Sequence, residues 1–289
     1  MISPRVLLGR GGRIETRRAP RNRLAWAAAA VIAAAVLAAL LAPVLPLIDP
    51  DAVDTPNRLK PPGVPGHWLG TDEFGRDLLT RIMYGARIAL FVGFTASFAG
   101  CTLGALLGVL SAYWGGTVDL LLERLMDILL AFPQLILALA IASILGPAVQ
   151  NVVVAIAVPV IPRVARVVRA TALSVKEHQY VEAVQALGAS RPRVVLQHII
   201  PNIMAPYLIM LTAFVGQAIL LEASLSFLGL GVTEPTPAWG LMLSGSAIDF
   251  YQQAPWMIVF PGVAISLAVF AFNLFGDSLR DWLDPKIKI

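Results

Sequence analysis

The feature that most constrains this chain is a set of long stretches in which no side chain is charged. A helix rises about 1.5 Å per residue, so one that crosses about 30 Å of hydrocarbon needs roughly 20 apolar residues. Charged residues make up only 14% of the sequence, against roughly 25% in an ordinary soluble domain. The pattern predicts an all-α polytopic membrane protein. The stretches that lack Asp, Glu, Lys and Arg are residues 24–48, 88–118, 128–162, 199–221 and 250–276.

The third stretch is too long for a single span. Gly146-Pro147, followed by Gln150-Asn151, is typical of a turn because these residues favour non-helical backbone. We therefore expect two helices there, over residues 128–145 and 150–170, and six transmembrane helices in total.

The N-terminal segment is strongly basic. Its apolar stretch, residues 24–48, is longer than the roughly 7–15 residues of a signal-peptide core, so we expect an uncleaved first helix behind a basic arm over residues 1–23. The net charge of +4 could also suggest nucleic acid, but no aromatic residues interleave with the arginines. We expect no nucleic-acid partner. The arginines of the arm are Arg5, Arg10, Arg13, Arg17, Arg18, Arg21 and Arg23.

The distribution of basic residues predicts the orientation. Placing the N-terminus in the cytoplasm puts 17 of the 22 basic residues on the inner side, as the positive-inside rule requires. Both termini are then cytoplasmic, including a tail over residues 283–289. The outer segment, residues 49–87, begins with a proline-rich stretch and then reads as an amphipathic helix. The five outer basic residues all lie in this segment: Arg58, Lys60, Arg76, Arg81 and Arg87.

Two of the remaining loops are long, one over residues 171–203 inside and one over residues 229–255 outside. In the inner loop, Ser174 and Glu177 fit a capping box, which predicts a helix that begins at Val175. Helical spacing then gives an apolar stripe, and Gly188 is placed to end the helix. The stripe consists of Tyr180, Val181, Val184 and Leu187.

This amphipathic helix has two interpretations. It could lie in the lipid headgroups, but a polar face that contains Glu177 and Glu182 is not favoured by anionic lipid. It could instead be the docking surface for a partner protein. The residues by themselves leave both interpretations open.

The run Glu182-Ala183-Val184-Gln185-Ala186-Leu187-Gly188, followed by His198-Ile199-Ile200-Pro201-Asn202, resembles the "EAA" loop of ABC-importer permeases. In that family this loop forms the coupling helix that engages a separate ATPase. Val184 replaces the second alanine of the family pattern and Ile200 its leucine, while a histidine at 198 resembles the peptide and nickel branch. The resemblance implies that the ATPase-coupling residues are Tyr180, Glu182, Ala183, Gly188 and Pro201.

Other segments extend this resemblance over residues 67–282. The runs at residues 67–77 and 84–87 are similar to the first outer loop of the second, "C-type" permease of dipeptide, oligopeptide and nickel importers. The runs at residues 222–231, 237–240, 254–256 and 260–262 are similar to its later segments. Residues 88–282 are accordingly expected to be the ABC permease core, with residues 171–203 as its coupling loop.

Several polar residues within the spans are candidates for function. Arg163, Arg166 and Arg169 could form a voltage-sensing helix, but snorkelling anchors that need no partner in the bilayer core are the simpler interpretation. Glu222 could couple transport to protons or could make a packing or gating hydrogen bond. The candidate translocation path is Gln150, Asn151, Gln217, Glu222 and Asn273, and ordinary interhelical hydrogen bonds explain these residues equally well.

Small residues recur along the second stretch at Gly93, Ala96, Gly100, Gly104 and Gly108, which predicts close helix packing within the subunit or across a permease pair. No phosphate-binding Gly-x-x-x-x-Gly-Lys-Ser/Thr motif and no His-Glu-x-x-His motif occurs. We therefore expect no catalytic residue, no metal site and no cofactor in this chain, and ATP and Mg²⁺ would be bound by partner subunits.

The resemblance implies a six-span type I importer permease fold in the cell membrane of a prokaryote. It also implies a heterodimer with a homologous permease, two ATPase subunits and an extracytoplasmic solute-binding protein. The expected cargo is a di- or oligopeptide. The alternatives are a permease for nickel or another small solute and a secondary transporter or channel that needs no ATPase.

Overall fold

The computed structural model describes residues 23–283. All but the last residue of the predicted basic arm, and the last six residues of the predicted tail, lie outside the described residues. Regular structure in the described part is helical, apart from two isolated β-bridges in the segment before the second helix.

Five continuous helical segments of the described chain are long and apolar enough to cross a membrane. They are α1 (Arg23–Leu41), α2 (Leu78–Trp114), α5 (Val149–Lys176), the run Arg191–Phe227 and α11 (Trp256–Leu283). The fourth run joins α7 (Arg191–Val194), a π-helical turn (Val195–Ile199) and α8 (Ile200–Phe227). The prediction of an all-α polytopic fold is confirmed.

The predicted span over residues 128–145 is not one straight helix. The chain forms α3 (Gly116–Leu130) and α4 (Gln134–Leu145), which meet at an angle of 91°. Pro133 has no N–H to donate and restricts the backbone of Phe132, so a helix that reaches this point breaks. The described residues therefore contain five candidate spans, or six if the bent pair counts as one.

The predicted amphipathic helix within residues 49–87 is also not a separate element. Residues 42–77 form an irregular segment with a single 3₁₀ turn, Thr55–Asn57, and the helix that follows is the start of α2. The Asp77 side chain accepts a hydrogen bond from the backbone N–H of Thr80 and so caps α2. The long helix begins ten residues before the uncharged stretch because this cap sets its start.

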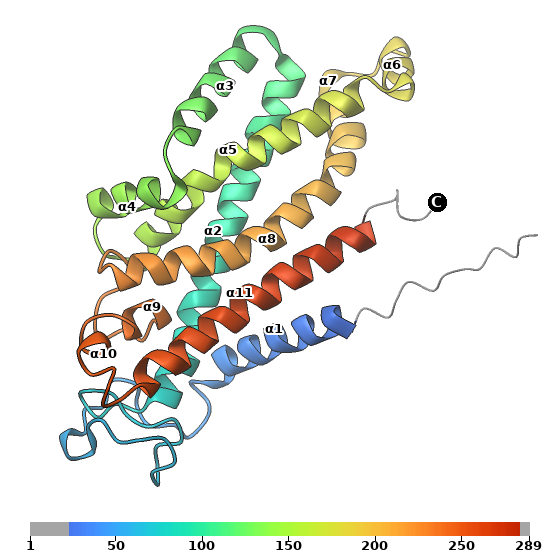
Figure 1. Cartoon of the computed structure of the whole chain (residues 1–289). Helices are drawn as coiled ribbons and strands as arrows, with labels where there is room; N and C mark the ends of the chain where they lie inside the picture. Colours follow the sequence, from blue (N-terminus) through green and yellow to red (C-terminus); the bar gives the residue numbers. More distant parts are fainter. Residues whose placement is uncertain (1–22, 284–289) are drawn as a thin grey trace, which may run out of the picture.

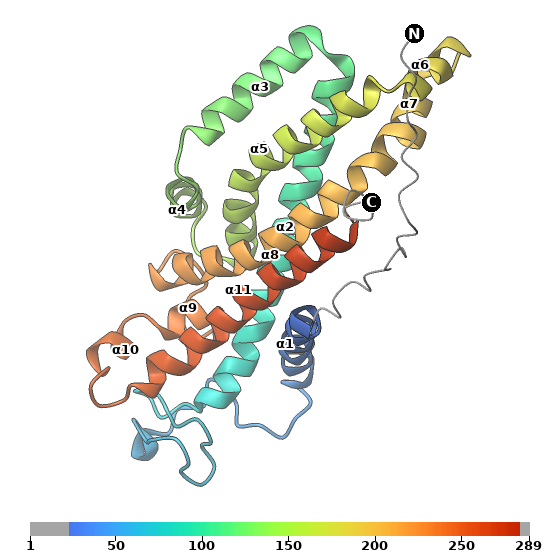
Figure 2. The same ribbon diagram turned by 45° about the vertical axis from the view of Figure 1, so that its right-hand side comes forward.

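Close packing of α2 against α5 organises the interior. A β-carbon at Gly100, Gly104 or Gly108 would lie within 2.8 Å of a carbonyl oxygen of α5. A β-carbon at Gly93 would lie 2.9 Å from the Ile219 side chain of α8. The small residues thus serve packing within the subunit, and α2 passes behind α5, α8 and α11 in both views (Figure 1 and Figure 2).

The two ends of the bundle carry different connections. At one end α5 turns back through α6 (Gln179–Ala186) and α7 toward α8 (Figure 1). At the other end the irregular segment 42–77 lies beside α9 (Trp239–Met242) and α10 (Ser246–Asp249), which connect α8 to α11.

Candidate functional site

The predicted coupling helix is present but begins later than expected. Residues 174–176 belong to α5, and a two-residue turn, Glu177 and His178, separates them from α6. No side chain caps α6, so the predicted capping box of Ser174 and Glu177 is wrong. The reason is that α5 continues through Ser174 to Lys176 before the chain turns.

The apolar stripe of α6 divides into an inner and an outer part. Val181 is fully buried and packs with Val175, Val194 and Ile199, while Val184 is half-buried against the same cluster. Tyr180 and Leu187 instead remain exposed, at 44% and 88% of their surface. One part of the stripe therefore fixes α6 to the bundle and the other part is left for another contact.

Gly188 ends this helix as predicted. Its φ of +84° lies in the left-handed region that favours glycine. The N–H of Gly188 donates to Gln185 O at 2.9 Å, and the N–H of Ala189 donates to Val184 O at 3.2 Å. This pair of bonds is the Schellman arrangement, which satisfies the last carbonyl groups of a helix and reverses the chain.

Tyr180 is held by groups from the π-helical turn and from α8. Its hydroxyl accepts a hydrogen bond from the Asn202 side chain at 3.2 Å, and its ring lies 6.0 Å from that of His198. Pro201 occupies the first turn of α8, where its fixed φ suits a helix start. Tyr180 and Pro201 are therefore parts of a defined joint between α6 and α8.

The remaining predicted residues point away from the bundle. Glu182 and Ala183 are exposed, and the Glu182 side chain makes no hydrogen bond or ion pair within residues 23–283. Leu196, on the π-helical turn, is also 63% exposed. We call the set formed by Tyr180, Glu182, Ala183, Leu187 and Leu196 the α6 surface.

Two of the three arginines of α5, Arg166 and Arg169, are not the unpartnered anchors that we expected. Arg169 donates two hydrogen bonds of 2.6 Å to the two carboxylate oxygens of Asp119 on α3. Arg166 is hydrogen-bonded to Asp127 of the same helix. The expectation failed because the sequence did not show that α3 would lie antiparallel beside α5 and present acids to it.

The five candidate path residues do not form one cluster. Asn151 donates to Leu145 O at 2.7 Å and to Gly146 O at 3.0 Å, which caps α4. Gln150 is exposed at the start of α5. Gln217 and Asn273 are exposed on neighbouring helices, since Asn273 Oδ1 would lie 3.2 Å from a β-carbon at Gly216.

Glu222 is buried near the end of α8, with 1% of its surface exposed. The Ser226 hydroxyl donates to its Oε1 at 2.7 Å, and its Oε2 has no hydrogen-bond partner within the described residues. This geometry agrees with a packing hydrogen bond. Glu222 is thus buried, whereas Gln217 and Asn273 are exposed.

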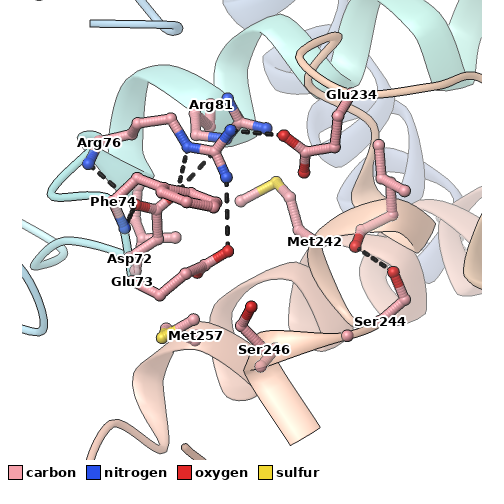
Figure 3. Close-up of a pocket in the computed structure, with 14 residues that line it drawn as sticks. Asp72, Glu73, Phe74, Arg76, Arg81, Glu234, Met242, Ser244, Ser246 and Met257 are labelled. Atoms are coloured by element: carbon pink, nitrogen blue, oxygen red, sulfur yellow. Dashed lines mark hydrogen bonds and ion pairs between the residues drawn. The ribbon is translucent and has the colours of Figure 1, made fainter. Parts of the chain in front are cut away.

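A network of buried charges at the opposite end was missed by the sequence reasoning. Arg76 contacts three carboxylates: Asp72 at 2.5 Å, Glu234 at 2.6 Å and Glu73 at 3.6 Å (Figure 3). Arg81 is 1% exposed and donates to Pro50 O at 2.9 Å and to Pro235 O at 3.3 Å. Together the two arginines join segment 42–77 to the loop between α8 and α9.

These charged groups line a cavity of about 350 Å³ whose other wall is formed by residues 241–247 and Met257. Burial raises the pKa of the Glu73 carboxyl above its ordinary value, and Asp72 and Glu234 raise it further. The spacing of Asp72 and Arg76, four residues apart, was a signal for local pairing, but the contact with Glu234 joins positions far apart in the sequence. No group of His, Cys, Asp and Glu within residues 23–283 is arranged to hold a metal ion.

Two family models match the sequence. Residues 104–289 match the binding-protein-dependent transport system inner membrane component, and residues 16–62 match the N-terminal transmembrane domain of oligopeptide transport permease C. The first match covers α3 to α11 and only the C-terminal part of α2, from residue 104, so it includes α6 and its flanking turns.

Curated relatives cover nearly the whole chain. The dipeptide transport system permease protein DppC of Alkalihalophilus pseudofirmus is 44% identical over 93% of this chain and 88% of its own length. The glutathione transport system permease protein GsiD of Escherichia coli is 43% identical over 77% of this chain and 73% of its own length.

A solved structure has the same fold. The methionine ABC transporter MetNI, in inward-facing conformations, matches with a TM-score of 0.55 and 18% identity, over 70% of this chain and 96% of the matched chain. The helical fold, the family models and the relatives agree. The chain belongs to the binding-protein-dependent transport system inner membrane components, the permeases of ABC importers.

Proposed function

We propose that this chain is the C-type permease subunit of an ATP-driven importer of di- or oligopeptides, and that the α6 surface docks to a separate ATPase. The observation that carries the proposal is the exposed half of α6. Tyr180 and Leu187 remain accessible although Val181 anchors the helix firmly. An apolar surface on an anchored helix is typical of a partner contact.

The proposed assembly has four kinds of component. This chain pairs with a homologous permease, two ATPase subunits bind ATP and Mg²⁺, and an extracytoplasmic solute-binding protein delivers the peptide. In this arrangement α6 and both termini face the cytoplasm. The basic residues support that topology through the positive-inside rule.

The proposed mechanism is alternating access. ATP binding closes the ATPase pair, α6 moves with it, and the spans reopen to the outside. ATP can drive this change only if it binds one state of the complex more tightly than the other. Gln217 and Asn273 are the candidate path residues best placed to meet a peptide, because both are exposed on adjacent helices.

Reversal of the charge at Glu182 tests the docking proposal. Glu182→Lys should leave the fold intact, because the side chain is exposed and unpaired and such changes alter stability by roughly 0.5 kcal/mol or less. A like-charge clash in the interface should lower ATP-dependent uptake in proteoliposomes by about tenfold or more. Asp281→Lys, an exposed reversal at the end of α11, is the matched control.

Wild-type uptake by Glu182→Lys in an assembled complex would overturn the docking proposal. The same proteoliposomes prepared without ATPase subunits test the transport class, because a secondary transporter or channel would still take up solute. Competition among dipeptides, longer peptides and nickel then tests the cargo. Inhibition by nickel without inhibition by peptides would favour the small-solute alternative.

A further inference from the structure

An ion-pair ladder links α3 to α5 next to the connection with α6. The acids lie at every fourth position of α3, at Asp119, Glu123 and Asp127, so they share one face of that helix. Arg166 and Arg169 face them from α5. Glu123 lies between the two arginines, 3.9 Å from Arg166 Nε and 3.5 Å from Arg169 Nε.

The contact between Arg169 and Asp119 is the least exposed ion pair of this ladder. It is bidentate, with two bonds of 2.6 Å, and such planar pairs fix orientation as well as distance. Ser111 of α2 donates to the same Asp119 carboxylate and accepts from Arg169 Nε at 3.2 Å. About a quarter of each ionic side chain is exposed, at 27% and 24%, so solvent screens this rung less than the outer pair of Arg166 and Asp127, at 44% and 46%.

The other end of the bent α3–α4 pair is attached to the same helix. Asn151, in the first turn of α5, donates to the carbonyl oxygens of Leu145 and Gly146 at the end of α4. The break at Pro133 separates α3 from α4. The two halves of the broken element are thus fastened to α5 separately, one by the ladder and one by the amide of Asn151.

Helix α5 leads almost directly into α6. Only Glu177 and His178 separate the two helices, and Val181 of α6 is buried against Val175 of α5. A displacement of α6 therefore acts first on α5. We propose that the ladder, together with the Asn151 cap, makes α3, α4 and α5 one body that transmits this displacement to the spans, with Arg169 and Asp119 as positioning residues.

This inference rests on the proposed function, since it assigns the ladder a role in transmitting movement from the ATPase. The test uses the complete complex in proteoliposomes and measures peptide taken up per ATP hydrolysed. Arg169→Ala and Asp119→Ala should each lower this ratio by about fivefold or more, in the range of a typical coupling energy, while ATP hydrolysis stays near wild type. The double variant should be no worse than either single variant, because both remove the same contact.

Two further variants separate positioning from folding. Arg169→Lys keeps the charge but cannot form the bidentate contact, so its ratio should fall between wild type and Arg169→Ala. Arg163→Ala, six residues earlier on α5, should behave as wild type, because no ion pair of Arg163 is found within residues 23–283. Thermal stability of each purified complex is measured in parallel.

Three results would overturn the inference. The first is an unchanged uptake per ATP in both alanine variants. The second is a double variant whose uptake per ATP falls by the product of the two single losses. The third is a fall in thermal stability that accounts for the loss of uptake while uptake per ATP stays the same. Failure of the proposed function looks different, because the wild-type complex would then show no uptake that depends on ATPase subunits.

Discussion

The connections between the long helices are built differently at the two ends of the bundle. Segment 42–77 and the α6–α7 connection both lack long regular elements. The first, together with the start of α2, buries charged groups, with Asp72 at 4% and Arg81 at 1% exposure. The second exposes apolar groups, with Leu187 at 88% and Leu196 at 63%.

This difference concerns how each end satisfies its own side chains. A buried arginine is stable only where carboxylates and carbonyl oxygens satisfy it, and Arg76 and Arg81 have such partners within the chain. The exposed leucines of α6–α7 have no comparable partners within residues 23–283. We therefore expect changes at the first end to alter stability and changes at the second end to alter coupling.

The largest expected effect is at the second end, in Gly188→Pro. Proline cannot adopt the φ of +84°, and it removes the N–H that donates to Gln185 O. The reversal after α6 would be lost and the α6 surface misdirected, so uptake in proteoliposomes should fall to background. Gly188→Asn is the control, because asparagine tolerates the left-handed region.

Uptake by Gly188→Pro at more than half the wild-type rate would contradict the expectation that changes at the α6–α7 end alter coupling. A loss of uptake of the same size in Gly188→Asn would also contradict it, because asparagine tolerates the left-handed region.

A smaller effect, on stability instead of coupling, is expected at the first end in Arg81→Met. Loss of one partner from a buried ionic network typically costs about 3–5 kcal/mol, which thermal unfolding in detergent would detect. Arg87→Met, two turns later on α2, removes only an exposed contact with the Tyr84 ring and should cost about 1 kcal/mol or less. Equal melting temperatures for the two variants would show that the Arg81 network does not stabilise this end.

The smallest expected effect is a pH dependence at Glu73. Burial raises the pKa of this carboxyl above its ordinary value of 4.5, so the folded state favours the protonated form more than the unfolded state does. This contribution to stability is full below pH 4.5 and is lost as the pH rises through the folded-state pKa. Glu73→Gln should therefore be more stable than wild type at neutral pH and equal to it in acid. A variant that is less stable at neutral pH would show that the bond with Arg76 dominates.

Local signals in the sequence predicted much of the fold. Uncharged stretches located the long helices because a spanning helix must be apolar along most of its length, and Gly188 marked a helix end because few residues adopt its φ. The glycines of α2 indicated close packing because small residues allow two helices to approach closely. The break at Pro133 was missed because the apolar pattern continues through it.

The contacts that define the two ends were harder to predict. Glu234 meets Arg76 across 158 positions of sequence, and Asp119 meets Arg169 across 50. Such pairs depend on which helices become neighbours, and the pattern of each helix by itself does not contain that information. The cap that Asn151 places on α4 is different, because its partners are only five and six residues away.

Thiol cross-linking from Leu187 tests the central claim most directly. Cys101 is buried and is the only cysteine, so a Cys101→Ala background allows Leu187→Cys and, at the opposite end, Trp68→Cys to be labelled singly with a thiol-reactive photo-crosslinker in the assembled complex. Both parent residues are well exposed, at 88% and 77%. The account predicts cross-links to the ATPase subunit from Leu187→Cys and none from Trp68→Cys. Cross-links to the ATPase from Trp68→Cys, or only to lipid from Leu187→Cys, would contradict it.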